Sequence, residues 1–105
     1  MLDHGVAGLG LIERSLAMAE RHVQDATQHV MFQRKIVDAL EKAACDGRFA
    51  RALLATFERS RALHIEDRNR LRGIRAETEL MVLYALLICQ RLDRLQSRIR
   101  SAGVG

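Results

Sequence analysis

The sequence contains no proline and no tryptophan, and its aromatic residues are limited to one tyrosine and three phenylalanines. So few aromatic side chains leave little to stack on nucleic-acid bases. Alanine, leucine, arginine and glutamate dominate the 105 residues instead, which is typical of long helices and coiled coils rather than of an ordinary globular domain. We therefore expect an all-α protein.

Cysteine and long apolar runs are scarce too. Cys45 and Cys89 lack the C-x-x-C spacing of a zinc site and are too few for a disulfide framework, so we interpret them as small apolar fillers in a reducing compartment. The run LMVLYALLIC at residues 80–89 is far shorter than the roughly 20 apolar residues of a membrane-spanning helix. The N-terminal MLDHGVAGLGLIER has no signal-peptide or myristoylation pattern. We expect a soluble, cytoplasmic protein without a membrane span.

A heptad pattern dominates the first half of the chain. One series of positions alternates in steps of three and four and is apolar with a single exception: Leu9, Ile12, Leu16, Ala19, Val23, Ala26, Val30, Gln33, Val37, Leu40 and Ala44. The opposite positions are basic or polar, as expected for the solvent face of such a helix. The pattern predicts a helix over about residues 9–44. The glycine-rich GVAGLG at residues 5–10 is not a G-x-G-x-x-G motif and predicts a flexible terminus.

A turn follows at residues 45–47, where Asp46 is a suitable N-cap and Gly47 a suitable turn residue. The second seam is Ala50, Leu53, Phe57, Ser60, His64, Asp67, Leu71, Ile74, Thr78, Met81, Ala85, Ile88, Leu92, Leu95, Ile99 and Ala102. Its phase does not slip at Gly73, so one helix over about 47–100 is favoured over two helices or a kink. The prediction is a single-domain, coiled-coil-like antiparallel helical hairpin over residues 1–105.

The open end of this hairpin is apolar on more than one face. Residues 9–18 lie opposite about 76–88, and Leu11 and Met18 are apolar outside the seam. Two helices bury one stripe each, so further helices are needed, and a second copy of the chain supplies them most simply. We expect a homo-oligomer, with a dimeric four-helix bundle favoured. The predicted interface residues are Leu9, Ile12, Leu16, Leu80, Leu83, Tyr84, Leu87 and Ile88.

Three stretches, AERHV at residues 19–23, IVDALEK at 36–42 and ARALLATFERSRALHIEDRNRLR at 50–72, resemble a group of small uncharacterised alphaproteobacterial helical-hairpin proteins of unknown function. The likeness covers about residues 17–72, so it excludes the apolar run. That family usually has a helix-ending glycine in a Gly-x-Asp turn, where this chain has Ala44-Cys45-Asp46. The resemblance therefore implies a helical hairpin with an atypical turn.

Four polar residues occupy seam positions: Gln33, Ser60, His64 and Asp67. Hairpin register places Gln33 near Ser60 and His64, with His22 and His29 beside the layer. One interpretation is a metal site, for which the candidate ligands are His22, His29, His64 and Asp67. No Glu-x-x-His pair of the di-iron type is present, so we favour a structural polar layer that fixes register and oligomer state.

Neither catalysis nor a cofactor is expected. Ser60, His64 and Asp67 have the residue types of a hydrolytic triad. On one straight helix, however, they lie side by side without oxyanion donors, because helical amides are already hydrogen-bonded. We expect no enzyme activity and no bound cofactor.

Nucleic-acid binding is the main alternative. The net charge is +4, and Arg61, Arg68, Arg72 and Arg75 follow one side of the second helix as possible phosphate contacts. Against this, Glu20 and Glu41 are placed to neutralise part of the stripe across the hairpin. The favoured function is therefore a non-enzymatic, self-associating helical protein that acts through protein–protein contacts. A small basic nucleic-acid-binding protein is the alternative, and a metal- or ligand-holding bundle is the third.

Overall fold

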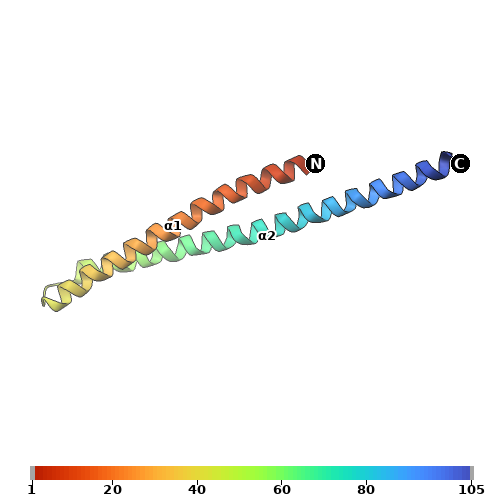
Figure 1. Ribbon diagram of the computed structural model, residues 1–105. Helices are drawn as coiled ribbons and strands as arrows, with labels where there is room; N and C mark the ends of the chain where they lie inside the picture. Colours follow the sequence, from red (N-terminus) through yellow and green to blue (C-terminus); the bar gives the residue numbers. More distant parts are fainter. Residues whose placement is uncertain (1, 105) are drawn as a thin grey trace. The chain divides into compact units, whose positions relative to one another are not determined.

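The computed structural model describes the backbone of residues 2–104 and the side chains of residues 7–103. Within that range the chain forms two α-helices and no strand. Helix α1 spans Leu2–Lys42 and helix α2 spans Arg48–Val104 (Figure 1). The all-α helical hairpin predicted from composition and periodicity is therefore confirmed. Neither helix has, among the residues searched, a stretch long and apolar enough to cross a bilayer.

Two compact units make up the chain. Residues 14–72 form the first, here called the hairpin unit, and residues 1–13 with 73–105 form the second, here called the terminal unit. Each unit contains a segment of both helices, because α1 and α2 both pass from one unit into the other.

The core of the hairpin unit is the seam predicted for α1. Its buried positions follow the three–four spacing without a break: Leu16, Ala19, Val23, Ala26, Val30, Gln33 and Val37. The positions between them are exposed, apart from half-buried Thr27 and Ile36. Helix α1 therefore presents one apolar stripe to α2, and its solvent face is mostly polar, with Met18, Met31 and Phe32 as exposed apolar exceptions. Val30 is the most deeply covered of these side chains.

Helix α2 turns a somewhat different face towards α1 than the one predicted. Phe57, His64 and Leu71 of the predicted seam are half-buried, but Ser60 is exposed. Arg61 and Arg68, each one residue after a predicted seam position, are half-buried. The predicted seam and the face that actually packs on α1 share every seventh residue, including Phe57, His64 and Leu71. The spacing of apolar residues alone therefore does not show which of the two faces is the inner one. Arginine fits the inner face because its aliphatic stem covers apolar surface while the guanidinium reaches solvent or a partner.

The turn ends α1 two residues earlier than predicted. Ala44 has a positive φ of 54°. The N–H of Cys45 donates to the carbonyl of Leu40 at 2.9 Å, and the N–H of Ala44 donates to the carbonyl of Glu41 at 3.0 Å. These two bonds form a Schellman motif, in which a residue in the left-handed region closes the last helical turn.

Asp46 was predicted as the N-cap of the second helix, but it is the residue before the N-cap. The first hydrogen bond within α2 runs from the N–H of Arg51 to the carbonyl of Gly47 at 2.8 Å, so Gly47 is the N-cap. Asp46 instead accepts, through Oδ1, a hydrogen bond from the backbone N–H of Arg48 at 3.1 Å. The Arg48 guanidinium also binds this carboxylate, at 3.0 Å. Side-chain and backbone hydrogen bonds from Arg48 together lower the pKa of Asp46 below its ordinary value.

Two features of the terminal unit differ from a simple hairpin end. Helix α1 starts at Leu2, so the stretch predicted as a flexible terminus at residues 5–10 is helical. Helix α2 is continuous through Gly73 and has 57 residues, whereas α1 has 41. Figure 1 shows α2 continuing beyond the point where α1 begins, and every residue from 86 to 103 is exposed. No side chain that the structure describes covers this part of α2.

Candidate interaction surface

The terminal unit carries a large apolar surface that is exposed to solvent in the single chain. Ten large hydrophobic side chains between residues 80 and 99 are exposed: Leu80, Met81, Leu83, Tyr84, Leu86, Leu87, Ile88, Leu92, Leu95 and Ile99. Soluble monomers rarely leave a contiguous apolar surface of this kind in water, and such surfaces mark interaction sites.

The residues predicted to make an oligomer interface divide into two groups. Leu80, Leu83, Tyr84, Leu87 and Ile88 are all exposed and belong to this surface. The three residues predicted from α1 are more covered: Leu9 and Ile12 are half-buried, and Leu16 is buried. Leu16 thus packs inside the hairpin unit and presents little surface to a partner, because the α1 seam is used within the chain.

One stripe of the apolar surface continues the predicted α2 seam. We call it the C-terminal seam, and its members are Ile74, Thr78, Met81, Ala85, Ile88, Leu92, Leu95 and Ile99. Thr78 and Ala85 are half-buried, and the other six are exposed. On one side of this seam α2 faces α1, since Arg75 pairs with Glu13 of α1 at 3.9 Å and Val82 is half-buried.

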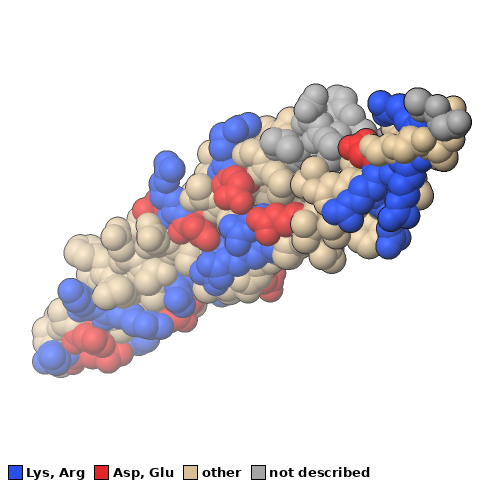
Figure 2. All heavy atoms as spheres, turned by 45° about the vertical axis from the view of Figure 1, so that its right-hand side comes forward, with Lys and Arg blue, Asp and Glu red and all other residues tan. Residues whose placement is uncertain are grey.

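The other side of the C-terminal seam carries a row of residues spaced by seven. We call it the outer flank, and it consists of Glu77, Tyr84, Arg91 and Arg98, all exposed. Tyr84, Ile88 and Arg91 help to line a shallow groove along α2. Figure 2 shows Lys and Arg side chains gathered at the end of α2, whereas basic and acidic side chains are interspersed elsewhere on the visible face. The row changes from acidic to basic along the chain.

The predicted polar layer does not form as one cluster. Gln33 is buried and donates from Nε2 to the carbonyl of Ala50 at 3.0 Å, which lies in the first turn of α2. Ser60 is exposed, and Asp67 binds the guanidinium of Arg70. The prediction fails because Gln33 binds the backbone of Ala50, whereas Ser60 lines a groove with His22 and His64, and half-buried Asp67 pairs with Arg70 on its own helix.

His64 belongs instead to a groove of the hairpin unit. Its ring centroid lies 5.2 Å from that of His22, and His29 lies 5.7 Å from the ring of Phe57. The groove is lined by these four rings together with Asp25, Ala26 and Ser60. Within the part of the chain that was searched, no three or more His, Cys, Asp or Glu residues are grouped so that they could hold a metal ion. Asp67 is not among the groove residues.

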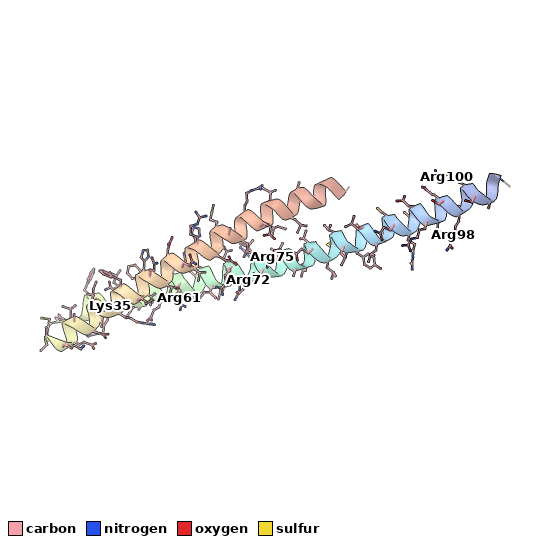
Figure 3. The ribbon with its side chains drawn as sticks, in the orientation of Figure 1. Lys35, Arg61, Arg72, Arg75, Arg98 and Arg100 are labelled. Carbon is pink, nitrogen blue, oxygen red and sulfur yellow. The ribbon has the colours of Figure 1, made fainter. Side chains whose placement is uncertain are left out.

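Three of the four arginines of the predicted phosphate stripe contact α1: Arg61, Arg72 and Arg75, which Figure 3 labels along α2. The guanidinium of Arg61 donates to Thr27 Oγ1 at 2.9 Å, and that of Arg72 pairs with Glu20 at 3.3 Å. Arg68 binds the side chain of its neighbour Asn69. Glu41 pairs with Arg51 at 3.5 Å. Two of the four arginines, Arg72 and Arg75, are therefore neutralised across the hairpin, and the stripe is a weaker phosphate track than its spacing suggested.

Cys45 and Cys89 are both exposed thiols, so the interpretation of them as apolar fillers is wrong. Cys89 lies in the part of α2 that no described side chain covers, and Cys45 is the last residue of the Schellman motif.

Three residues of the outer flank were not predicted as interface residues: Glu77, Arg91 and Arg98. The signal that finds them is their seven-residue spacing from Tyr84. That spacing has no evident role until the structure shows which side of the seam faces α1.

Comparisons with protein-family models, curated proteins and solved structures found no significant match to this sequence.

Proposed function

We propose that this chain is a non-enzymatic protein that self-associates through the terminal unit and acts through protein–protein contacts. The observation that carries the proposal is the C-terminal seam, which is apolar and yet exposed in a single chain. A homodimer with a four-helix core is the arrangement we favour, since a two-fold symmetric interface uses the same surface on both subunits.

The unpartnered end of α2 supports association on energetic grounds. Most helical stability in proteins comes from packing an apolar face, not from helix propensity. Each large apolar side chain fully removed from water contributes about 1.5–3 kcal/mol. Burial of Leu92, Leu95 and Ile99 on a second copy therefore offsets the entropy of ordering this segment.

A second copy is a better candidate for covering this surface than nucleic acid. The surface is apolar along the seam, and the arginines of the predicted stripe bind groups of α1 or their own neighbours. Phosphate binding also predicts a steep loss of affinity between about 50 and 200 mM salt, whereas apolar association persists.

The experiment is sedimentation velocity over a wide range of protein concentrations. The parent is expected to sediment as a concentration-dependent oligomer. Leu92→Glu is expected to sediment as monomer, because an unpaired carboxylate in the interface costs several kcal/mol. Met31→Glu is the matched control, since Met31 and Leu92 are each 54% exposed in the single chain but Met31 lies in the hairpin unit. A parent that stays monomeric, or equal behaviour of the two variants, overturns the proposal.

A further inference from the structure

We propose that two copies pair antiparallel along their C-terminal seams, in the single register that sets Glu77 opposite Arg98 of the second copy and Tyr84 opposite Arg91. This inference rests on the proposed self-association and specifies its geometry. Two independent features of α2 carry it: the order of residues along the outer flank, and the point at which one stripe of the helix changes from polar to apolar.

The occupant of the seam is a second copy because the seam continues an interface that already exists within the chain. Up to Ala85 the helix is partly covered on its α1 side. Residues 86–103 are all exposed, although the apolar spacing goes on. In an antiparallel pair of heptad helices, the two kinds of seam position face each other. The facing pairs in the proposed register are Ile74 with Ile99, Met81 with Leu92, and Ala85 with Ile88.

The outer flank selects an antiparallel arrangement. Flanking positions on the same side of the seam meet each other in antiparallel pairs, and opposite charges there set orientation and partner choice. Glu77 lies near one end of the flank and Arg98 at the other, so reversal of the second helix brings each acid to a base. Neither side chain makes an ion pair with another described side chain. Figure 3 shows Arg98 pointing away from the helix axis.

The centre of the flank gives a second matched contact. Arg91 meets Tyr84 of the second copy twice, once on each side of the symmetry axis. A guanidinium over a tyrosine ring is an attractive cation–π pair, and both residues already border the same groove on α2. A parallel, in-register pair places Glu77 beside Val82 and Arg91 beside Gln96, so it gains neither contact.

Neighbouring antiparallel registers are disfavoured by like charges. A shift of one heptad towards the C-terminus sets Arg91 against Arg91 of the second copy, and a shift of two heptads sets Arg91 against Arg98. A shift in the other direction sets Arg98 against Arg70. Like charges at facing positions oppose pairing. The Arg91–Arg91 contact occurs once, on the symmetry axis, and the other two like-charge contacts occur twice. The shift that sets Arg98 against Arg70 also sets Glu77 against Arg91, so its charge contacts cancel, whereas the proposed register places no like charges together along the outer flank.

The stripe of α2 that faces the partner supports the same register. Every seventh residue along it is Leu53, Ser60, Asp67, Ile74, Met81, Ile88 and Leu95. The positions at 60 and 67 are polar, and those from 74 onward are apolar. In the proposed register Ile99, the last large apolar residue of the seam, faces Ile74, the first residue of the apolar part of this stripe. The shift away from the C-terminus sets Ile99 against Asp67 instead.

The first test is a charge swap on two exposed positions. Glu77→Arg and Arg98→Glu each place like charges at two symmetric contacts and are expected to weaken the dimer about tenfold at low salt. The double variant, with both substitutions in every chain, is expected to restore parental affinity to within about twofold. Circular dichroism of each variant controls for helicity. Additive weakening in the double variant overturns the register while leaving self-association intact.

The second test measures the register directly with one spin label. Ser97 is exposed, and a label at Ser97→Cys is placed in a Cys45→Ser, Cys89→Ser background. In the proposed register the two labels are offset along the axis by about 21 residues, or about 32 Å at 1.5 Å per residue. The next register predicts about 21 Å, and a parallel pair predicts only the interhelical separation of about 10 Å. Electron–electron distances at either smaller value refute the proposed pairing.

The two proposals fail in different ways. A parent chain that is monomeric in sedimentation contradicts self-association and the register together. A parent that forms dimers but shows the shorter label distance, or no rescue in the double variant, contradicts only the register.

Discussion

Replacement of Ala44 by glycine is expected to stabilise the folded chain. Ala44 has a φ of 54° and is exposed, so the substitution relieves backbone strain and removes little packing. The left-handed conformation costs an L-residue about 1–2 kcal/mol, a penalty that glycine avoids. Glycine also loses more entropy on folding, which offsets about 0.4–1 kcal/mol of the gain. The expected net increase in the free energy of unfolding is about 0.5–1 kcal/mol.

The hydrogen bonds of the turn allow this gain to be realised. Both Schellman bonds, from Cys45 to Leu40 and from Ala44 to Glu41, use backbone atoms only. They remain possible in the variant, and glycine is the residue most often found at this position. The neighbouring Ala43 is a control, because among the described non-glycine residues Ala44 alone has a positive φ. Ala43→Gly is expected to be destabilising, since glycine gains nothing there and its unfolded state is more flexible.

Urea unfolding followed by circular dichroism measures both variants. All proteins are compared at one concentration, because self-association adds to apparent stability by mass action. With a slope of about 1–2 kcal/mol per molar urea, the Ala44→Gly midpoint is expected to rise by about 0.5 M. If Ala44→Gly lowers the midpoint as Ala43→Gly does, the strain assigned to the turn is not present in the folded chain.

Two further substitutions test α2 and its start. Gly73→Ala is expected to raise the free energy of unfolding by about 1 kcal/mol, because Gly73 is helical and a Cβ there meets no atom within 4 Å; a thermal melt that shows no gain argues against a continuous helix at this residue. Asp46→Asn is expected to be less stable than the parent at neutral pH, because bonds from Arg48 lower the folded pKa of Asp46 below the ordinary 3.8. A lowered carboxylate pKa stabilises the fold above the unfolded pKa and ceases to do so as the pH falls through the folded pKa, so the two melting temperatures should converge in acid. A difference that persists there refutes the role of the charge.

The sequence alone predicted the fold class and the inner face of α1, because both depend on one clear period. Leu16, Ala19, Val23, Ala26 and Val30 stand at strict three–four spacing and are buried, whereas the residues between them are exposed apart from half-buried Thr27. The inner face of α2 could not be assigned in the same way. Arg61 and Arg68 are covered there because a long aliphatic stem can pack on α1 while its charge stays solvated, and hydrophobicity counts such residues as outward-facing.

The turn and the polar residues were less predictable for a different reason. Alanine seldom adopts positive φ, so Ala44 gave no local signal for the end of α1. Gln33 was placed correctly on the inner face, but its hydrogen-bond partner is the carbonyl of Ala50. Side-chain amides often bind backbone carbonyls, and residue spacing does not identify which carbonyl is in reach.

The seam predicted for α2 combines two faces of one helix, and this explains its partial agreement with the structure. Positions shared by both phases, such as Phe57 and Leu71, are half-buried against α1. The remaining predicted positions lie to one side. In the hairpin unit they include exposed Ser60 and half-buried Asp67, which are polar. In the terminal unit they include Met81 and Leu95, which are apolar and yet exposed. One period of seven along α2 therefore serves contact with α1 over one part of the helix, and in our proposal contact with a second copy over the other. A helix that needed only α1 could have remained polar on this side throughout.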